Sequence, residues 1–531
     1  MYAVERAPEV PLSGGPEEWL RSMLARSDKN HAGKRIGFQF MSTRLISTMM
    51  EDSGVRFGTS GARGLVVSMT DEVCYAYTTA FLQHLESKSP STGENGAVAV
   101  AGDLRPSTPR IMAAVMRAVS DAGYTPRNCG RVPSPAVALH GLQEKIPAIM
   151  VTGSHIPDDR NGIKYNTPAG EILKEDEQGI RAQSVDLSDL FDGDGSFREG
   201  GVVPELTTVA SDVYVARWLD SFPSDFLSGV RMGLYQHSAV GRDLLRSVYE
   251  SLGASVSLLA PSEEFVPVDT EAIRNEDVEL ARRWAESGDF DCIVSTDGDS
   301  DRPLISDEKG KWIRGDVAGI LTARYLSADV VVTPVSSNSA VESCGWFREV
   351  HMTRIGSPYV IAEMIRAVQA GGERVVGYEA NGGFLTATAM DLESGTLEPL
   401  PTRDPVIVHL GVLGLAKREN VSVSGLLDLL PRRFTASDRL QSFPTDISLD
   451  RIEELTAGGS SVIEAAFPTF GAVRSADSTD GLRIRFVSGD LVHLRPSGNA
   501  PELRCYSEAD TEERAWEVNR DAMTVLQTWR E

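Results

Sequence analysis

The sequence predicts a multidomain α/β protein with mixed, mostly parallel sheets and a C-terminal α+β domain. From Arg56 onward, short and almost continuously apolar segments alternate with segments of helical periodicity. Apolar strands separated by helices are typical of parallel sheets that helices cover on both faces. After about residue 430 the strands follow one another directly, which is typical of α+β domains. At 531 residues the chain is also too long for one hydrophobic core, and its length predicts three or four domains.

The predicted strands of the α/β part are short apolar segments, most of them ended by Gly, Asp or Thr. They are Ala97–Ala101, Ala148–Val151, Cys292–Val294, Val330–Val332 and Val375–Val376. Between the first two, Ile111, Val115 and Val119 recur at helical spacing and predict a helix. In the C-terminal part, Leu482–Phe486 and Leu491–Leu494 predict two strands joined by a turn, and Glu512–Trp529 predicts a closing helix.

These changes of pattern divide the chain. We expect an N-terminal extension over residues 1–50, in which Glu17–Arg26 is a short amphipathic piece and the extension a partly ordered helical arm. We expect domains over residues 51–205, 206–315, 316–432 and 433–531. The sequence contains no obvious repeat or long linker.

Composition excludes several classes of protein. The formal net charge of −24 argues against general binding to nucleic acid, which needs a basic surface. The five cysteines are scattered and form no CxxC pair, so we expect neither a zinc site nor a disulfide framework. The sequence has no apolar segment typical of a signal peptide or a membrane span. We therefore expect a soluble, cytoplasmic protein without membrane partners, and the sequence makes no prediction of oligomeric state.

The strongest chemical signal is an aspartate cluster, Asp297, Asp299 and Asp301, which follows an apolar strand. Three carboxylates at alternate positions gather hard oxygen ligands around one cation. A calcium-binding EF-hand is excluded because Arg302 stands where that loop needs glycine. Three protein ligands leave coordination positions open, which suits Mg²⁺ shared with a phosphate.

A serine follows another predicted strand, in Thr152-Gly153-Ser154-His155-Ile156-Pro157. Ligands bind at the carboxyl ends of parallel strands in open α/β sheets, which makes Ser154 a candidate site residue. Taken alone, Ser154 is more simply explained as a turn serine. A serine hydrolase is a poor interpretation, because the segment is not G-x-S-x-G and His155 is badly placed to act as base for its own neighbour.

Two further segments carry polar groups suited to a sugar phosphate. Glu379 and Asn381 lie in a glycine-rich turn, where they could accept hydrogen bonds from sugar hydroxyls. The segment Arg495–Pro501, with Arg504 after it, combines guanidinium, hydroxyl, amide and backbone N–H groups suited to a phosphate. A surface turn and a plain loop are the simpler explanations of these segments. The glycine-rich segment Gly58–Gly64 fits neither G-x-G-x-x-G nor a P-loop.

In this order the four segments resemble the α-D-phosphohexomutase superfamily, over most of the chain from Arg56. That family carries a serine loop, a metal loop, a sugar loop and a phosphate loop on four successive domains. The resemblance implies three related α/β domains plus a smaller C-terminal domain around a central active-site cleft. Residues 51–205 would then form the phosphoserine domain, 206–315 the metal-binding domain, 316–432 the sugar-binding domain and 433–531 the phosphate-binding domain.

The resemblance also implies residue roles. Ser154 would carry a phosphoryl group and would hold Mg²⁺ together with Asp297, Asp299 and Asp301. Lys164, in Asn161-Gly162-Ile163-Lys164, would manage protons with His155 and Arg63. Arg302 would steady the phosphoryl oxygens, and Glu379 with Asn381 would bind the sugar. The clamp for the non-reacting phosphate would consist of Arg495, Ser497, Asn499 and Arg504.

The implied activity is a phosphohexomutase reaction on a small sugar phosphate, with hexose 1,6-bisphosphate as intermediate and activator. The segment Glu379–Phe384 is most similar to bacterial phosphomannomutases, which favours interconversion of mannose 6-phosphate and mannose 1-phosphate. A phosphoglucomutase, or an enzyme that accepts both sugars, is the alternative. Departures from the usual family pattern bear on the substrate: Ile156 stands where asparagine is commoner, and Asn499-Ala500 where Thr-Glu is usual.

Two other classes are weaker interpretations. A silent sugar-phosphate sensor should have lost the serine or an aspartate, and this chain retains them all. A phosphatase built on the same metal loop would need a water-activating residue, and the sequence offers none beyond those of a mutase.

Overall fold

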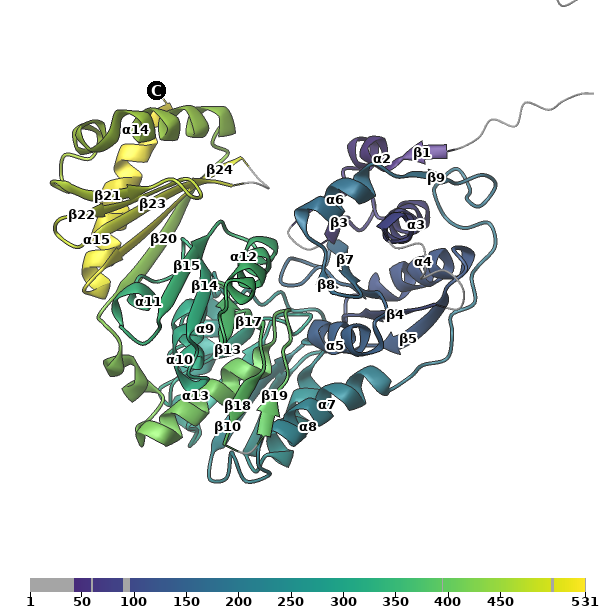
Figure 1. Cartoon of the computed structure of the whole chain (residues 1–531), viewed down its shortest axis with the longest axis horizontal. Helices are drawn as coiled ribbons and strands as arrows, with labels where there is room; N and C mark the ends of the chain where they lie inside the picture. Colours follow the sequence, from purple (N-terminus) through teal and green to yellow (C-terminus); the bar gives the residue numbers. More distant parts are fainter. Residues whose placement is uncertain (1–42, 59–60, 89–95, 394, 498–500, 531) are drawn as a thin grey trace, which may run out of the picture. The chain divides into compact units, whose positions relative to one another are not determined.

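The computed structural model describes residues 43–58, 61–88, 96–393, 395–497 and 501–530. The amphipathic piece Glu17–Arg26 and the predicted helical arm lie outside these residues. Within them the fold is α/β with several mixed sheets followed by an antiparallel α+β part, which confirms the predicted fold class (Figure 1).

Three of the sheets contain the same four-stranded unit. Its strand orders are β5-β4-β6-β7, β11-β10-β12-β13 and β15-β14-β16-β17. In each unit the first three strands are parallel and the fourth runs antiparallel to the third. The strands of the three units are β4 Ala97–Gly102, β5 Thr125–Gly130, β6 Ala148–Val151, β7 Arg160–Thr167, β10 Arg231–His237, β11 Ser255–Pro261, β12 Cys292–Thr296, β13 Pro303–Ile305, β14 Val330–Pro334, β15 Glu349–Thr353, β16 Val375–Tyr378 and β17 Phe384–Thr386.

The first unit is extended into a seven-stranded sheet. Antiparallel strands β2 (Arg56–Phe57), β3 (Gly61–Leu65) and β8 (Gly170–Glu171) join it through β7. Antiparallel pairs therefore outnumber parallel ones here, and the expected mostly parallel arrangement does not hold for this sheet. The reason is that β2 and β3, β6 and β7, and β7 and β8 are each joined by a short connection, which allows only an antiparallel pair.

Two helices connect the parallel strands within each unit, and other helices lie before and after the units in the chain. Together these helices are α3 Asp71–Lys88, α4 Thr108–Asp121, α5 Ser134–Glu144, α6 Lys174–Arg181, α7 Val209–Ser221, α8 Arg242–Ser251, α9 Asn275–Ser287, α10 Gly315–Tyr325, α11 Ala340–Ser343, α12 Ser357–Gln369 and α13 Pro405–Glu419. The predicted helix through Ile111, Val115 and Val119 is α4, and all three side chains are buried. Helix α13 is buried over its first twelve residues and packs against α10, which explains its almost wholly apolar sequence.

Residues 43–50, which the sequence places in the N-terminal extension, form β1 (Thr43–Leu45) and the start of α2 (Ile46–Ser53). Strand β1 pairs with β9 (Ser184–Asp186). Ile46 and Met49 are buried in the same hydrophobic cluster as the seven-stranded sheet. These residues therefore pack as part of that sheet's core.

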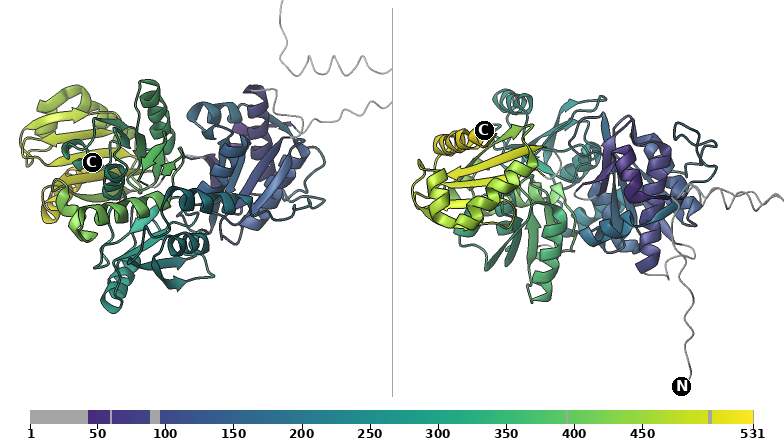
Figure 2. Two further views of the ribbon diagram at one scale, coloured as in Figure 1. Left: turned by 60° about the horizontal axis from the view of Figure 1, so that its bottom comes forward. Right: turned by 90° about the horizontal axis from the view of Figure 1, so that it is seen from above.

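The C-terminal part has its own sheet and its own core. Its antiparallel strands are β20 Phe434–Gln441, β21 Val473–Asp477, β22 Leu482–Phe486, β23 Leu491–Pro496 and β24 Glu502–Ala509, in the order β20-β24-β23-β22-β21. Helices α14 (Thr445–Ala466) and α15 (Glu512–Gln527) pack against this sheet (Figure 2). The two strands and the closing helix predicted here are β22, β23 and α15. The remaining elements are the hairpin β18 Met390–Leu392 with β19 Gly395–Leu397 and two 3₁₀ turns, Ser424–Leu429 and Thr528–Arg530.

None of the helices in the described part of the chain is both long and apolar enough to cross a bilayer.

Candidate active site

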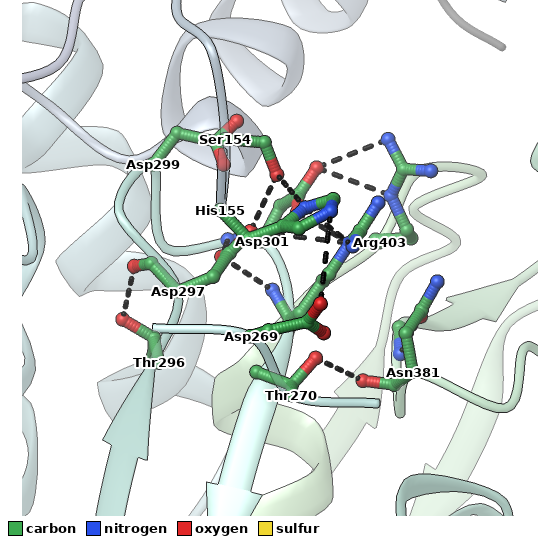
Figure 3. Close-up of polar contacts among 12 residues, drawn as sticks. Ser154, His155, Asp269, Thr270, Thr296, Asp297, Asp299, Asp301, Asn381 and Arg403 are labelled. Carbon is green, nitrogen blue, oxygen red and sulfur yellow. Dashed lines mark hydrogen bonds and ion pairs between the residues drawn. The ribbon is translucent and has the colours of Figure 1, made fainter. Parts of the chain in front are cut away.

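The same connection in each four-stranded unit carries candidate site residues. The loop from the third strand to its antiparallel fourth strand contains Ser154 in the first unit, the aspartate cluster in the second, and Glu379 with Asn381 in the third. Figure 3 shows residues of all three loops lying close together. The repeated topology therefore places a hydroxyl group, a cluster of carboxylates, and a carboxylate with an amide at equivalent positions of the three units. Contacts between the three loops join these groups into one site.

Ser154 is fully buried and adopts a left-handed backbone, with φ 58°. A non-glycine residue in this conformation is strained and is kept there only by its surroundings. Its backbone N–H donates to Thr152 Oγ1 at 2.8 Å, and Thr152 Oγ1 donates to Asp103 Oδ2 at 2.7 Å. Its hydroxyl donates to Asp297 Oδ2 at 2.6 Å. The serine loop thus presents Ser154 Oγ directly to the aspartate cluster.

Arg105, which the sequence analysis did not single out, holds the serine loop from behind. Its guanidinium donates to the backbone carbonyls of Ser154, Ile156, Pro157 and Arg160 at 2.6 to 3.2 Å. Arg105 is 1% exposed and forms an ion pair with Asp103. A buried arginine that bonds four carbonyls fixes the path of the loop. No sequence pattern predicts this, because the contacts join segments about fifty residues apart.

Asp297, Asp299 and Asp301 form the one cluster of possible metal ligands found among the described residues, with ligand atoms within 4.8 Å of one another. Protein donors occupy both oxygens of Asp297 and one oxygen each of Asp299 and Asp301. Asp297 Oδ1 accepts from the backbone of Asp301 and Arg302, and Asp299 Oδ2 from Ser134 Oγ at 2.5 Å. Asp299 Oδ1 and Asp301 Oδ1 are buried and accept no hydrogen bond in the described part of the chain, and the cation nearest Asp301 Oδ1 is Arg302, whose Nε lies 3.8 Å away. Unpaired buried carboxylate oxygens are costly, and a hard cation such as Mg²⁺ satisfies them.

Lys164, on β7, neutralises part of this negative charge. Its Nζ lies 2.5 Å from Asp299 Oδ2 and 2.6 Å from Asp301 Oδ2. Burial by itself would lower the pKa of Lys164, but the two carboxylates outweigh burial and raise it. Burial raises the pKa of Asp299, and Lys164 and Ser134 outweigh burial and bring it below its usual range. The lysine therefore stays charged and both carboxylates stay ionised.

Asp297 differs from its two neighbours. Burial, followed by the like charges of Asp299 and Asp301, raises the pKa of Asp297 well above its usual value. Its Oδ2 accepts the Ser154 hydroxyl, and its nearest cation is Arg302 at 3.9 Å. A cation bound at this cluster would supply the positive charge that Asp297 lacks.

His155 and Arg302 lie beside Ser154. Arg302 Nη1 donates to His155 Nδ1 at 2.9 Å, and Nδ1 is 3.3 Å from Ser154 Oγ. Burial, and next the Arg302 charge, lower the pKa of His155 to about 3, so His155 is neutral at pH 7. Asp269 lies 4.0 Å from His155 Nε2. Asp269 belongs to a loop after β11 that sequence analysis missed, and its neighbour Thr270 donates to the carbonyl of Asn381.

The loop that carries Glu379 and Asn381, which the resemblance assigns to sugar binding, is tied to the aspartate loop through Arg403. Glu379 is 4% exposed, and Arg403 Nη1 donates to its Oε2 at 3.3 Å. Arg403 also donates to Asp301. Asn381 closes its own turn, because its Oδ1 accepts from the backbone of Gly383 at 2.9 Å. The sequence did not point to Arg403, which lies about 20 residues beyond the glycine-rich turn.

The predicted phosphate clamp is partly described. Arg495, at the end of β23, donates to Asp480 Oδ2 at 3.0 Å, and Ser497 donates its backbone N–H to Glu502. Arg504 lies on β24 directly opposite Arg495. Asn499 lies outside the described residues. The structure therefore brings two of the four predicted clamp residues, Arg495 and Arg504, side by side on neighbouring strands.

A cleft of about 690 Å³ is lined by neighbours of Ser154 and the aspartates together with residues of the other two segments. Its walls include Arg63 on β3, His155, Lys164, Arg302, Glu379, Asn381, Arg403, Arg495 and Arg504. Burial, and next Arg302, lower the pKa of Arg63 to about 10, which leaves it charged at pH 7. Cations therefore line a cleft in a chain that is strongly acidic overall, as an anionic substrate requires.

The chain is similar to known proteins over most of its length. The sequence matches family models described as phosphoglucomutase/phosphomannomutase: α/β/α domain I over residues 54–188, α/β/α domain III over 314–434 and the C-terminal domain over 451–524. A phosphomannomutase of Salmonella muenchen is 42% identical over 481 residues, which cover 90% of this chain and 97% of the relative. The chain belongs to the phosphoglucomutase/phosphomannomutase family. This confirms the resemblance stated from the four segments.

Two more comparisons agree with membership in the phosphoglucomutase/phosphomannomutase family. A phosphomannomutase of Sinorhizobium fredii is 41% identical and covers 89% of this chain and 99% of the relative. The crystal structure of a phosphoglucomutase/phosphomannomutase family protein from Burkholderia thailandensis superposes with a TM-score of 0.68. It covers 89% of this chain and 97% of its own at 20% identity, which establishes a shared fold.

Proposed function

We propose that this chain is a phosphomannomutase that interconverts mannose 6-phosphate and mannose 1-phosphate through a phosphoserine at residue 154. One observation carries the proposal: the Ser154 hydroxyl donates to Asp297 inside a buried cluster of three carboxylates, two of which have an oxygen that accepts no hydrogen bond from the described residues. A serine in this setting is suited to carry a phosphoryl group beside a divalent cation. The relatives named phosphomannomutase, at 41% and 42% identity, favour mannose over other hexoses.

The residues have separate tasks in the proposed reaction. Asp297, Asp299, Asp301 and phosphorylated Ser154 would hold Mg²⁺, which neutralises phosphoryl oxygens. The phosphoryl group leaves Ser154 Oγ and joins a hydroxyl oxygen of the sugar monophosphate, which gives a hexose 1,6-bisphosphate. The bisphosphate turns end for end and returns its other phosphate to Ser154. Hexose 1,6-bisphosphate would also serve as activator, because it rephosphorylates an enzyme that has lost its phosphate.

The cleft residues support positioning and proton transfer in this proposal. Arg302 steadies the phosphoryl oxygens, and Lys164, His155 and Arg63 handle the proton that the sugar hydroxyl gains or loses. Glu379 and Asn381 accept hydrogen bonds from sugar hydroxyls. Arg495, Ser497, Asn499 and Arg504 clamp the phosphate that is not reacting, and one clamp serves both orientations of the bisphosphate. The four domains over residues 51–205, 206–315, 316–432 and 433–531 stay a prediction.

Replacement of the serine tests the central step. Ser154→Ala removes the atom that carries the phosphate, so we expect kcat to fall by at least about 10⁴-fold, the size of loss typical when a covalent nucleophile is removed. Intact-mass and peptide analysis should find one phosphate on active wild-type protein at Ser154 and none on the variant. Ser442 is a matched control, because it has the same left-handed backbone (φ 52°) in a turn outside the cleft. Ser442→Ala should keep its activity. Full activity of Ser154→Ala would refute the proposal.

A phosphoglucomutase, or an enzyme that accepts both sugars, is the second candidate, and it is favoured by the family description that names both activities. Mannose and glucose differ only in the orientation of the C2 hydroxyl. Coupled assays with mannose 1-phosphate and glucose 1-phosphate should give a kcat/KM at least about tenfold higher for the mannose compound. Equal values would assign dual specificity.

A further inference from the structure

Arg403 lies between two loops that the proposed function treats as separate sites. It is 3% exposed and comes two residues before the start of α13. Figure 3 shows its guanidinium beside Asp301 of the metal loop. Its Nε and Nη2 lie 3.1 and 3.0 Å from Asp301 Oδ2, and its Nη1 donates to Glu379 Oε2 at 3.3 Å. One rigid planar group therefore contacts both a proposed metal ligand and the proposed sugar-binding carboxylate.

Arg403 also determines which oxygen of Asp301 is left for a cation. Arg403 and Lys164 both bond Oδ2, whereas Oδ1 accepts no hydrogen bond from the residues described and lies 3.8 Å from Arg302 Nε. The guanidinium thus fixes the orientation of the Asp301 carboxylate through two contacts to the same oxygen.

The position of Arg403 is itself fixed from two sides. Ser357 Oγ accepts from Arg403 Nη1 at 3.2 Å and donates to Glu171 of β8 at 2.9 Å, and Thr402 donates to the same Glu171 at 2.7 Å. On the sugar-loop side, a Cβ added to Gly383 would lie 2.4 Å from Arg403 Cδ. The glycine after Asn381-Gly382 therefore permits the loop to pack directly on the arginine stem.

We propose that Arg403 is the positioning residue that couples the metal loop to the sugar loop, so that its loss weakens cation binding and sugar-phosphate binding together. The proposal rests on the proposed function for the identity of the two ligands. Arginine is required because its planar fork reaches Asp301 and Glu379 at once, whereas a lysine ammonium is a single point charge. Residues that orient metal ligands typically change metal affinity 10- to 100-fold when they are replaced.

Direct binding measurements on the full-length protein test the coupling without turnover. In Arg403→Lys we expect the Mn²⁺ dissociation constant, measured by EPR of free Mn²⁺, to rise at least about tenfold. We expect a similar rise in the dissociation constant of mannose 6-phosphate, measured by calorimetry. Arg483→Lys is the matched control, because Arg483 is also buried and paired with an acid, Glu342, outside the cleft. Both constants should stay within twofold of wild type in that control. A rise in only one constant, or in neither, overturns the proposal.

A double-mutant cycle tests the bridge that Arg403 forms between Asp301 and Glu379. Glu379→Gln removes a charge that is not a metal ligand, so we expect a three- to fivefold weaker Mn²⁺ affinity in the wild-type background. The same change should have less than a twofold effect in the Arg403→Lys background, because the bridge is already broken. Equal effects in both backgrounds overturn the proposal. If wild-type protein converts neither mannose nor glucose phosphates, the proposed function fails, and the Mn²⁺ measurements still decide the role of Arg403.

Discussion

At the residue scale, Lys164 is the buried counterion of two carboxylates in the aspartate cluster. Its side chain is 13% exposed, and it pairs with Asp299 and Asp301 at 2.5 and 2.6 Å. Removal of one partner from a buried ion pair leaves an uncompensated charge and costs about 3–5 kcal/mol. Exposed pairs contribute much less, because water screens them.

We therefore expect Lys164→Met to lower the free energy of unfolding in EDTA by about 3 kcal/mol, measured by urea denaturation. Added Mg²⁺ should recover part of this loss, because the cation neutralises the same carboxylates. Lys174→Met is the control: Lys174 is 41% exposed and pairs with Glu177 at 2.7 Å, so its loss should cost less than about 1 kcal/mol. Equal losses in the two variants would contradict the assignment of Lys164 as a buried counterion.

The site residues that could not be predicted from the sequence share one property. Arg105, Arg403, Ser134 and Asp269 each act through partners distant in sequence, such as Asp299 for Ser134. Ser154 and the three aspartates could be predicted because strand ends and alternate carboxylates are local patterns. Arg105 could be found only from the structure, because its four acceptors are backbone carbonyls, which every residue has whatever its side chain.

At the scale of elements, the metal and serine loops touch through backbone. A Cβ added to Gly298 would lie 2.7 Å from the carbonyl oxygen of Ser154. The backbone of Gly298 is not in the left-handed region. A glycine is needed at this position only because the two loop backbones approach each other too closely for a side chain.

We expect Gly298→Ala to push the two loops apart and to lower kcat/KM about 100-fold, the loss expected for a displacement near 1 Å. Steady-state kinetics would measure this. Gly193→Ala is the control, because its Cβ would meet nothing within 4 Å, and its activity should stay close to wild type. Wild-type activity in Gly298→Ala would show that the loops can separate without cost.

The N-terminus of α13 contains a buried acid with an unusual ionisation. Asp404 caps this helix by accepting from Val406 N at 2.9 Å, and Tyr214 donates to it at 2.9 Å. Burial raises the pKa of Asp404 to about 6 from a usual value of 3.8. The folded protein therefore binds this proton more tightly than the unfolded chain, and its stabilising effect is complete below about pH 4 and is lost as the pH rises through about 6.

Asp404→Asn should remove this pH dependence, because asparagine can still accept at the helix cap and does not titrate. The free energy of unfolding of wild type minus that of the variant should fall by about 3 kcal/mol between pH 4 and pH 7, from a shift of about two pKa units. Urea denaturation at several pH values would measure it. A constant difference over this range would mean that Asp404 titrates normally.

At the scale of the whole molecule, the proposed cation site lies where loops from different sheets meet, so cation binding should stabilise the described fold. Mg²⁺ at about 100 times its dissociation constant should add about 2.7 kcal/mol to the free energy of unfolding. EDTA should abolish activity, and excess Mg²⁺ should restore it. Thermal unfolding at increasing Mg²⁺ would test this, with Asp299→Asn expected to lose the stabilisation. A wild-type transition that does not respond to Mg²⁺ would argue against the cation site.

The sequence by itself determined the fold class and the family. Apolar strand segments, helical spacing and four short polar segments are local patterns. The apolar patterns can be recognised in the sequence because the buried faces of strands and helices need apolar residues at regular spacing. The assigned roles of the site residues and the domain limits stay predictions. Only the tertiary structure decided that one repeated connection, between the third strand and its antiparallel neighbour, brings Ser154, the aspartates and Glu379 together. It also decided that Arg403 joins two of those loops, because ion pairs between segments about 100 residues apart depend on packing and not on local sequence.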